Sequence, residues 1–237
     1  MTKTLTVAEA ALREIARRRG VLLLLALLPL AFYFSRRGTE YWQSVRFVSL
    51  GIGWTLSTAA LFAGNAARGI EPRLRLCGYA TYQLYLGRLA ALWAVGFALA
   101  TPYFLLIRFD LDDVRYDGIA LILLLTVVVA PPLGLAVSAV LPRELEGMLV
   151  LLTIVAMQMM LDPDEAVAHA LPFWFTREIG EYAIQSNAGA DHVARGLVHT
   201  SVVLAVVLAL GGCAAAVRLR RQVPLTASPS GPSGPTI

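Results

Sequence analysis

Six apolar stretches constrain the fold of this chain more than any other feature of its sequence. They cover about residues 20–35, 45–67, 84–107, 118–141, 147–161 and 193–217. A helix that crosses a bilayer needs about 20 predominantly apolar residues, a length that the second, third, fourth and sixth stretches reach. The first and fifth are shorter, and the arginines at 17–19 can lengthen the first by snorkelling to the membrane surface. We therefore predict an all-α membrane protein with six transmembrane helices between residues 20 and 221.

The composition agrees with this prediction. Hydrophobic residues make up 57% of the chain and charged residues 15%, whereas soluble domains average about 45–50% and about 25%. The net charge is only +4, and the basic residues stand beside the apolar stretches. A nucleic-acid-binding domain would instead gather them on one folded surface. We therefore expect the lipid bilayer as a partner, and no nucleic acid.

The segments that flank the apolar region differ from it in character. In residues 5–19, Leu5, Leu12 and Ile15 fall on one helical face, while Glu9 and Arg13 fall on the other. This pattern predicts an amphipathic helix in the membrane interface over residues 1–19, with an ordinary N-terminal extension as the alternative. Residues 222–237 are rich in Pro, Ser and Gly and are predicted to form a disordered tail. With six spans, both ends of the chain lie on the same side of the membrane, and most lysine and arginine residues fall on that side. The positive-inside rule therefore places both ends in the cytoplasm.

The longest loop, residues 162–192, separates the fifth and sixth apolar stretches. Pro172 suits a helix start, and Phe175, Ile179 and Tyr182 have helical spacing. We predict one or two short re-entrant or interfacial helices on the outer side of the membrane. Their aromatic side chains are expected at the level of the lipid headgroups.

Small residues at a spacing of four mark the faces on which the helices are expected to pack closely. Such faces let two backbones approach where water supplies no hydrophobic drive. Three stretches carry them: Gly51, Thr55, Ala59, Ala63 and Ala67 in the second, Ala130, Gly134 and Ser138 in the fourth, and Ala205, Ala209 and Cys213 in the sixth. Pro131 and Pro132 each remove a backbone donor, so the fourth helix is predicted to break or kink there.

Catalytic patterns are weak in this sequence. Ser49, Ser57 and Ser138 could each pair with His199, but none stands in the Gly-x-Ser-x-Gly context of a nucleophilic serine. The chain also has no glycine-rich phosphate-binding loop, so any ATP-driven activity requires another polypeptide. We predict no catalytic residue and no directly bound cofactor.

Metal-binding patterns are equally weak. His192 and His199 lie seven residues apart and could bind a metal together with Asp191, although one solvated and one packed histidine are the more common arrangement. Cys77 and Cys213 lie in no zinc-binding spacing and are expected to stay reduced. We predict no bound metal.

Polar and aromatic residues inside two spans are the candidates for a substrate pathway. Polar groups within a membrane usually face protein or a cavity rather than lipid. The candidates are Trp54, Thr58, Phe62 and Asn65 in the second span and Met157 and Gln158 in the fifth. The alternative is that these side chains are ordinary core or lipid-facing residues.

The loop between the second and third spans is predicted to carry a short helix that binds a cytosolic partner. Charged residues, then an amphipathic segment, fill residues 66–88. The charge comes from Glu71, Arg73 and Arg75, and apolar anchors come from Leu74, Leu76, Tyr79 and Tyr82.

Taken together, these segments resemble the ABC-2 type transporter permeases, the membrane subunits of ABC exporters. The resemblance covers about residues 5–220 and rests on the amphipathic N-terminal segment, on Glu71 ahead of Leu74 and Leu76, on the Gly87-Arg88 pair, and on the helical segment that starts near 171. The chain has Pro72-Arg73-Leu74 where Gly-Thr-Leu is usual in the family, and Tyr79-Ala80 where a proline is common.

The resemblance implies a function and a set of partners. It implies a permease that forms a dimer with a second protomer, binds cytosolic ATPase subunits through residues 71–82, and depends on their ATP and Mg²⁺. Such a permease would export a small amphipathic compound (a drug, an antibiotic or a lipid-like molecule) across the bacterial inner membrane by alternating access. Two alternatives remain: a membrane-embedded enzyme, and the six-helix substrate-capture subunit of a vitamin importer.

Overall fold

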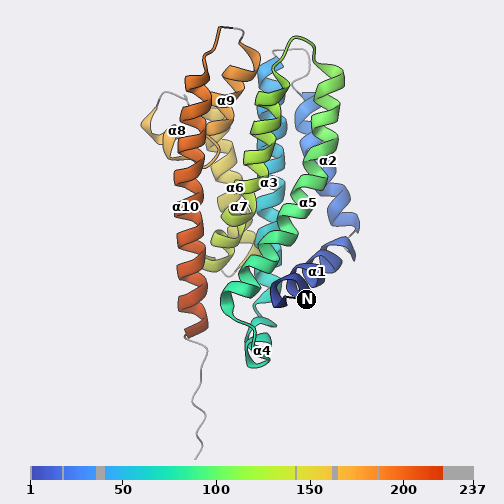
Figure 1. Cartoon of the computed structure of the whole chain (residues 1–237), viewed down its shortest axis with the longest axis vertical. Helices are drawn as coiled ribbons and strands as arrows, with labels where there is room; N and C mark the ends of the chain where they lie inside the picture. The colour runs from blue at the N-terminus through green and yellow to red at the C-terminus, as the bar shows by residue number, and fades with distance from the viewer. Residues whose placement is uncertain are drawn as a thin grey trace, which may run out of the picture.

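The computed structural model describes residues 2–17, 19–35, 41–141, 143–161, 165–185 and 187–220, and the regular structure in these ranges is entirely α-helical. The helices form one elongated bundle (Figure 1). In chain order they are α1 (Lys3–Arg17), α2 (Arg19–Ser35), α3 (Tyr41–Ala67), α4 (Glu71–Leu76), α5 (Thr81–Asp110), α6 (Tyr116–Val140), α7 (Glu144–Met160), α8 (Ala166–Ala170), α9 (Phe175–Ile184) and α10 (Ala190–Arg220). The predicted tail, residues 222–237, lies outside the described residues.

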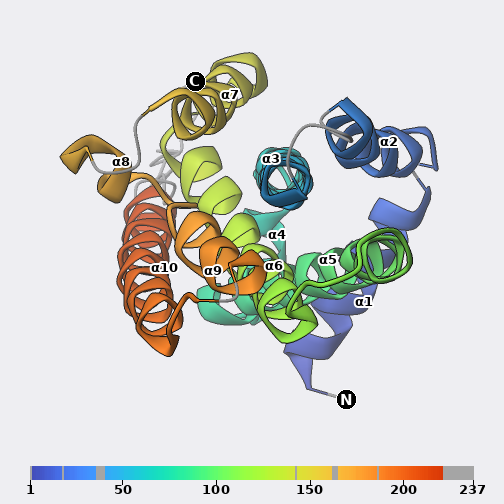
Figure 2. The same cartoon turned by 90° about the horizontal axis from the view of Figure 1, so that it is seen from above.

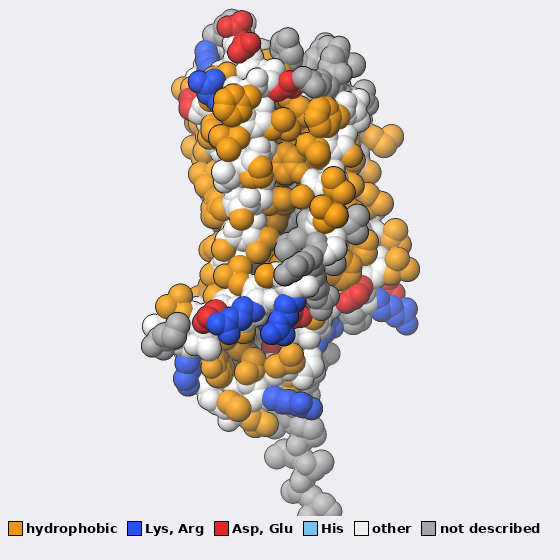
Figure 3. Space-filling view, turned by 90° about the vertical axis from the view of Figure 1, so that its right-hand side faces the viewer, with side chains coloured by type: hydrophobic (Ala, Val, Ile, Leu, Met, Phe, Trp, Pro, Cys, Tyr) orange, Lys and Arg blue, Asp and Glu red, His pale blue; other side chains and the backbone are white. Residues whose placement is uncertain are grey.

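Four of these helices are long and apolar enough to cross a membrane. The qualifying segments are Gln43–Ala67, Thr81–Asp110, Tyr116–Val140 and Ala190–Ala214, which match the second, third, fourth and sixth predicted spans. α2 and α7 have 17 residues each, about 26 Å of helix against a hydrocarbon core of about 30 Å. Hydrophobic side chains cover the middle of one face of the bundle, with charged groups toward both ends (Figure 3). The described residues are thus all-helical, and four helices of membrane-spanning length and hydropathy indicate a membrane protein.

The centre of the bundle is the contact between α3 and α6, the most extensive in the molecule. Gly134 of α6 lies against the carbonyl of Ser57 and the side chain of Ala60. The Ser57 hydroxyl donates a hydrogen bond to the Ala130 carbonyl at 2.9 Å. A Cβ on Gly64 would lie 2.8 Å from the Cβ of Ser138. Small residues of α6 therefore bring the two backbones together, as predicted.

The predicted small face of α3 is used differently. A Cβ on Gly51 would lie 2.9 Å from the Phe32 ring and 3.0 Å from Pro29, so at this level the face meets α2. α6 instead contacts the side of α3 formed by Ser57, Ala60 and Gly64. A spacing of four identifies a small stripe but not the neighbour that fills it.

α6 runs unbroken from Tyr116 to Val140 through Pro131 and Pro132. Of the predicted break or kink at these prolines, the break is wrong, because the helix continues through both residues. A proline at 132 removes the N–H that would normally bond the carbonyl of Val128. That carbonyl accepts a hydrogen bond from the Trp93 indole of α5 at 3.2 Å. A side chain of a neighbouring helix thus satisfies a backbone group that the proline leaves without its usual donor.

Short helices lie at the two ends of the bundle (Figure 1). At one end, α1 crosses α5 at Gly87, where a Cβ would lie 2.7 Å from the Thr4 carbonyl and from Val7, and α4 extends beyond the long helices. The opposite end carries α8 and α9, the short helices predicted between the last two apolar stretches. Phe173, Trp174 and Phe175 are buried in the protein here and pack into its core. The expected headgroup level of these aromatic side chains stays a prediction. Phe173 fills the space over Gly53 of α3.

Candidate functional site

A buried ion pair attaches α4 to the bundle. The guanidinium of Arg88 on α5 donates to the carboxylate of Glu71 at 2.9 Å, and the two side chains are 11% and 6% exposed. Removing one partner of such a pair typically costs about 3–5 kcal/mol, because the other charge is left buried without compensation. Glu71 therefore holds α4 in place and does not present its charge at the surface. Arg88 was a missed site residue, although an arginine inside an apolar stretch signals that a partner is needed.

The outer side of α4 combines apolar and basic groups. Leu76 is 90% exposed, and two neighbouring residues are also exposed, Ile70 just before α4 and Tyr82 in the first turn of α5. Arg73 and Arg75 are exposed beside them, while Leu74 is half-buried. Because α4 extends past the end of the bundle (Figure 1), these side chains form a protruding surface, which we call the α4 surface.

A cleft of about 710 Å³ adjoins the α4 surface, between the start of α5 and Gly212 of α10. Lys3 of α1 donates a hydrogen bond to the Gly78 carbonyl at 2.7 Å, and its ammonium lies 5.5 Å from the centre of the Tyr79 ring. Gly78 adopts a positive φ of 81°, which favours glycine and lets the chain turn from α4 into α5. The cleft is lined by Arg75, Gly78, Tyr79, Ala80, Thr81, Tyr82, Tyr85 and Gly212.

The predicted pathway residues of α3 lie together on one side of that helix, which we call the α3 stripe: Trp54, Thr58, Phe62 and Asn65. The stripe falls between the contact of Gly51 with α2 and the contact of Leu61 with Gly147 of α7. Viewed along the bundle, α2 and α7 lie on two sides of α3 (Figure 2). Thr58 is buried, and the other three side chains are half-buried.

Several polar atoms of the predicted pathway are buried without a hydrogen-bond partner. They are the indole nitrogen of Trp54, the hydroxyl of Thr58, both amide atoms of Asn65 and the side-chain oxygen of Gln158. Burying an amide or hydroxyl without a partner costs roughly 2–7 kcal/mol, depending on the reference state. These groups are therefore expected to find a partner outside this chain, or in water.

The two intramembrane amides lie at opposite ends of α3. The backbone carbonyl of Gln158 on α7 accepts a hydrogen bond from the Arg46 side chain at 2.5 Å, so Gln158 lies beside residue 46 of α3. Asn65 lies 19 residues further along α3, about 28 Å away at 1.5 Å per residue. Met157 is exposed on α7 next to Gln158. The predicted residues thus follow the length of the bundle and do not form one polar cluster.

The serine and histidine candidates are occupied by structural contacts. The hydroxyls of Ser49, Ser57 and Ser138 donate to the carbonyls of Val45, Ala130 and Leu135. His199 lies 3.0 Å from the carbonyl of His169, and its ring is 5.2 Å from that of Trp174. His192 is oriented toward a different group of side chains on α9.

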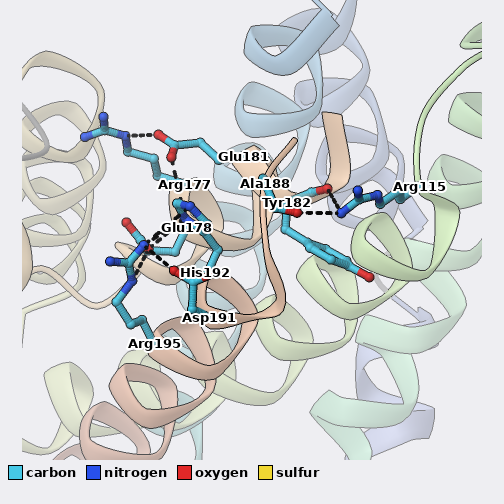
Figure 4. A network of polar contacts seen from close by, with 9 residues as sticks. All are labelled: Arg115, Arg177, Glu178, Glu181, Tyr182, Ala188, Asp191, His192 and Arg195. Carbon is cyan, nitrogen blue, oxygen red and sulfur yellow. Dashed lines mark hydrogen bonds and ion pairs between the residues drawn. The ribbon is translucent and has the colours of Figure 1, made fainter. Parts of the chain in front are cut away.

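The group around His192 is a polar network that the sequence did not reveal (Figure 4). It joins Glu178 and Glu181 of α9 to His192 and Arg195 of α10. The signal that could have identified it is the i, i+3 spacing of the two glutamates, which places them on one face of a short helix.

No family model matches this sequence, and no curated protein matches it either.

Proposed function

We propose that this chain is the membrane subunit of an ATP-driven exporter of the ABC-2 type, whose ATPase is a separate cytosolic polypeptide. The observation that carries the proposal is α4, a short helix at one end of a membrane-protein bundle that is fixed by the buried Glu71–Arg88 pair and exposes Leu76. A segment that couples two subunits must be held firmly against its own bundle, and it must expose a surface to which the partner can bind. α4 combines both properties.

The α4 surface has the composition of a binding site for a protein. A few apolar side chains dominate the energy of most interfaces, and arginine is enriched among them. Leu76 and Tyr82 supply exposed apolar anchors, with the half-buried Tyr79 next to this surface. Arg73 and Arg75 supply charge that suits an acidic partner surface. Glu71 contributes by holding the helix.

The proposal assigns six spans to the chain. α2 and α7 are the two short ones and join the four helices that are long enough by themselves. The proposal puts α1 in the membrane interface near α4. Its crossing of α5 at Gly87 and the exposure of Leu5 and Arg13 support this position. Both termini then lie in the cytoplasm of a bacterial cell, and the bilayer is the inner membrane.

The α3 stripe is proposed as the substrate pathway, covered by a second copy of the permease. Its buried polar atoms without partners support this role, since a facing protomer or a water-filled pathway would remove their desolvation cost. Trp54 and Phe62 beside Thr58 and Asn65 suit a small amphipathic compound, which alternating access would move outward.

The test is the variant Leu76→Glu, with Val167→Glu as its matched control. Val167 is an exposed apolar residue on α8, the short helix at the opposite end. The wild-type chain, purified from native membranes, should carry a partner that a photoreactive ATP analogue labels. Leu76→Glu should weaken that association roughly 30-fold, since a hot-spot residue contributes about 2 kcal/mol or more.

The Val167→Glu variant should retain the labelled partner at the wild-type level. Equal retention by both variants would show that α4 is not the coupling segment. A wild-type chain that carries no ATP-binding protein would overturn the exporter proposal itself.

A further inference from the structure

Three potential metal ligands converge where α9 meets α10. The Nδ1 atom of His192 lies 3.2 Å from Oε2 of Glu178 and 3.6 Å from Oε2 of Glu181. One ligand atom from each residue falls within 4.8 Å of the other two. All three side chains are directed toward one another in Figure 4.

These separations suit a tetrahedral metal ion. Zinc binds imidazole nitrogen and carboxylate oxygen at about 2.0–2.2 Å, so two ligands of one tetrahedral ion lie about 3.4 Å apart. The two distances from His192, 3.2 and 3.6 Å, bracket this value. Calcium would require six to eight oxygen ligands, and magnesium also prefers oxygen. We propose that Glu178, Glu181 and His192 bind a divalent transition metal of the zinc class.

The protein holds the three ligands in a fixed frame. A Cβ on Gly196 of α10 would lie 2.6 Å from Ile179, so the two helices touch next to the site. On the other side, Arg115 donates to the carbonyls of Tyr182 and Ala188 at 3.2 and 3.0 Å, which ties the connection between α9 and α10 to the start of α6. The ligands are therefore positioned by contacts that do not involve the metal.

Two arginines lie near the proposed ligands. Arg177 supports metal binding, and Arg195 competes with the metal. Arg177 bonds Oε1 of Glu181 at 2.9 Å and leaves Oε2 directed toward His192. Arg195 bonds Oε2 of Glu178 at 2.9 Å and also reaches Nδ1 of His192 at 3.0 Å, so it occupies the same lone pairs as the metal. Its side chain is 54% exposed and has a second carboxylate, Asp191, at 3.7 Å. Arg195 can therefore leave the site when a metal enters.

This competition separates the metal site from a simple ion-pair network. If the group only holds α9 against α10, replacing Arg195 removes a favourable contact. If the group binds zinc, the same replacement removes a competitor and strengthens binding. The prediction does not depend on the proposed export function, because α4 and the α3 stripe take no part in it.

The experiment measures zinc binding to the full-length protein in detergent after removal of any affinity tag. Calorimetry should show one saturable Zn²⁺ per chain, and zinc should raise the unfolding temperature. His192→Gln should weaken binding at least about tenfold and abolish the temperature shift. Arg195→Gln should bind zinc more tightly than the wild type. His169→Gln, which changes another histidine at the same end of the bundle, should behave like the wild type.

Two results would overturn the site. One is an equal zinc affinity of the wild type and His192→Gln, which would assign the ion to other groups. The other is the absence of saturable binding in the wild type together with a lower unfolding temperature of Arg195→Gln, which would leave an ion-pair network alone.

Discussion

At the residue scale, the contact between Trp93 and Val128 explains how α6 tolerates two adjacent prolines. In a hydrocarbon environment no water is available to satisfy a carbonyl that loses its helical donor. The Trp93 indole supplies that donor from α5 at 3.2 Å. The sequence shows the two prolines but not the hydrogen bond that compensates for one of them. Residues 93 and 128 meet only because α5 packs against α6.

Replacing Trp93 with phenylalanine should therefore destabilise the protein by about 1–3 kcal/mol, the cost of a buried polar group left unsatisfied. Pro132→Ala in the same chain restores an N–H that can reach the Val128 carbonyl, so the double variant should recover part of that loss. Thermal unfolding in detergent measures both effects. A double variant whose loss equals the sum of the two single losses would show that the two residues do not act on the same carbonyl.

The same scale shows what a sequence can and cannot reveal about the candidate site. Leu76, Arg73 and Arg75, which were predicted to contact a partner, are exposed, and their role in binding stays a prediction. Glu71 was expected at the surface but pairs with Arg88, 17 residues away. Which charges are buried depends on how α4 folds back on α5, and local patterns do not contain that information.

At the element scale, close approach of α3 and α6 depends on Gly134. Its position directly over the Ser57 carbonyl leaves no room for a Cβ, and the obstacle is backbone rather than a flexible side chain. Long apolar stretches predicted both helices well, because length and hydropathy are local properties. The side of α3 that receives α6 was not predictable, since Gly51 and Gly64 offer equally small surfaces on different faces.

Gly134→Ala should accordingly destabilise the protein by about 1–3 kcal/mol, the usual cost of overpacking a core. Gly180→Ala on α9 is the matched control, because a Cβ there meets nothing within 4 Å. The control should be neutral or stabilise slightly, as expected for alanine within a helix. The comparison requires unfolding temperatures of both variants in one detergent. A tolerated Gly134→Ala would mean that the two helices can separate without loss.

At the scale of the whole molecule, the surfaces proposed to have a function lie at different levels of the bundle. α4 lies at one end of the bundle, α9 and the start of α10 lie at the opposite end, and α3 runs between the two ends (Figure 1). Helix type and the long spans followed from the sequence. The burial of residues 173–175 could not be predicted from the sequence. The same aromatic pattern is found in segments that lie among lipid headgroups and in segments that pack into a protein core.

The last prediction concerns the second protomer that is proposed to cover the α3 stripe. In a chain with Cys77→Ser and Cys213→Ser, a single Phe62→Cys should form a disulfide-linked dimer on mild oxidation in membranes. Facing cysteines cross-link only when their Cα atoms approach to about 4–7 Å. Phe62 lies on the stripe beside the buried, unpartnered groups of Thr58 and Asn65, so a symmetric partner would bring two copies together there. Val202→Cys, on an exposed face of α10, is the control and should remain monomeric on a non-reducing gel. Dimers from Val202→Cys but not from Phe62→Cys would place the interface on α10 and remove the stripe from the pathway.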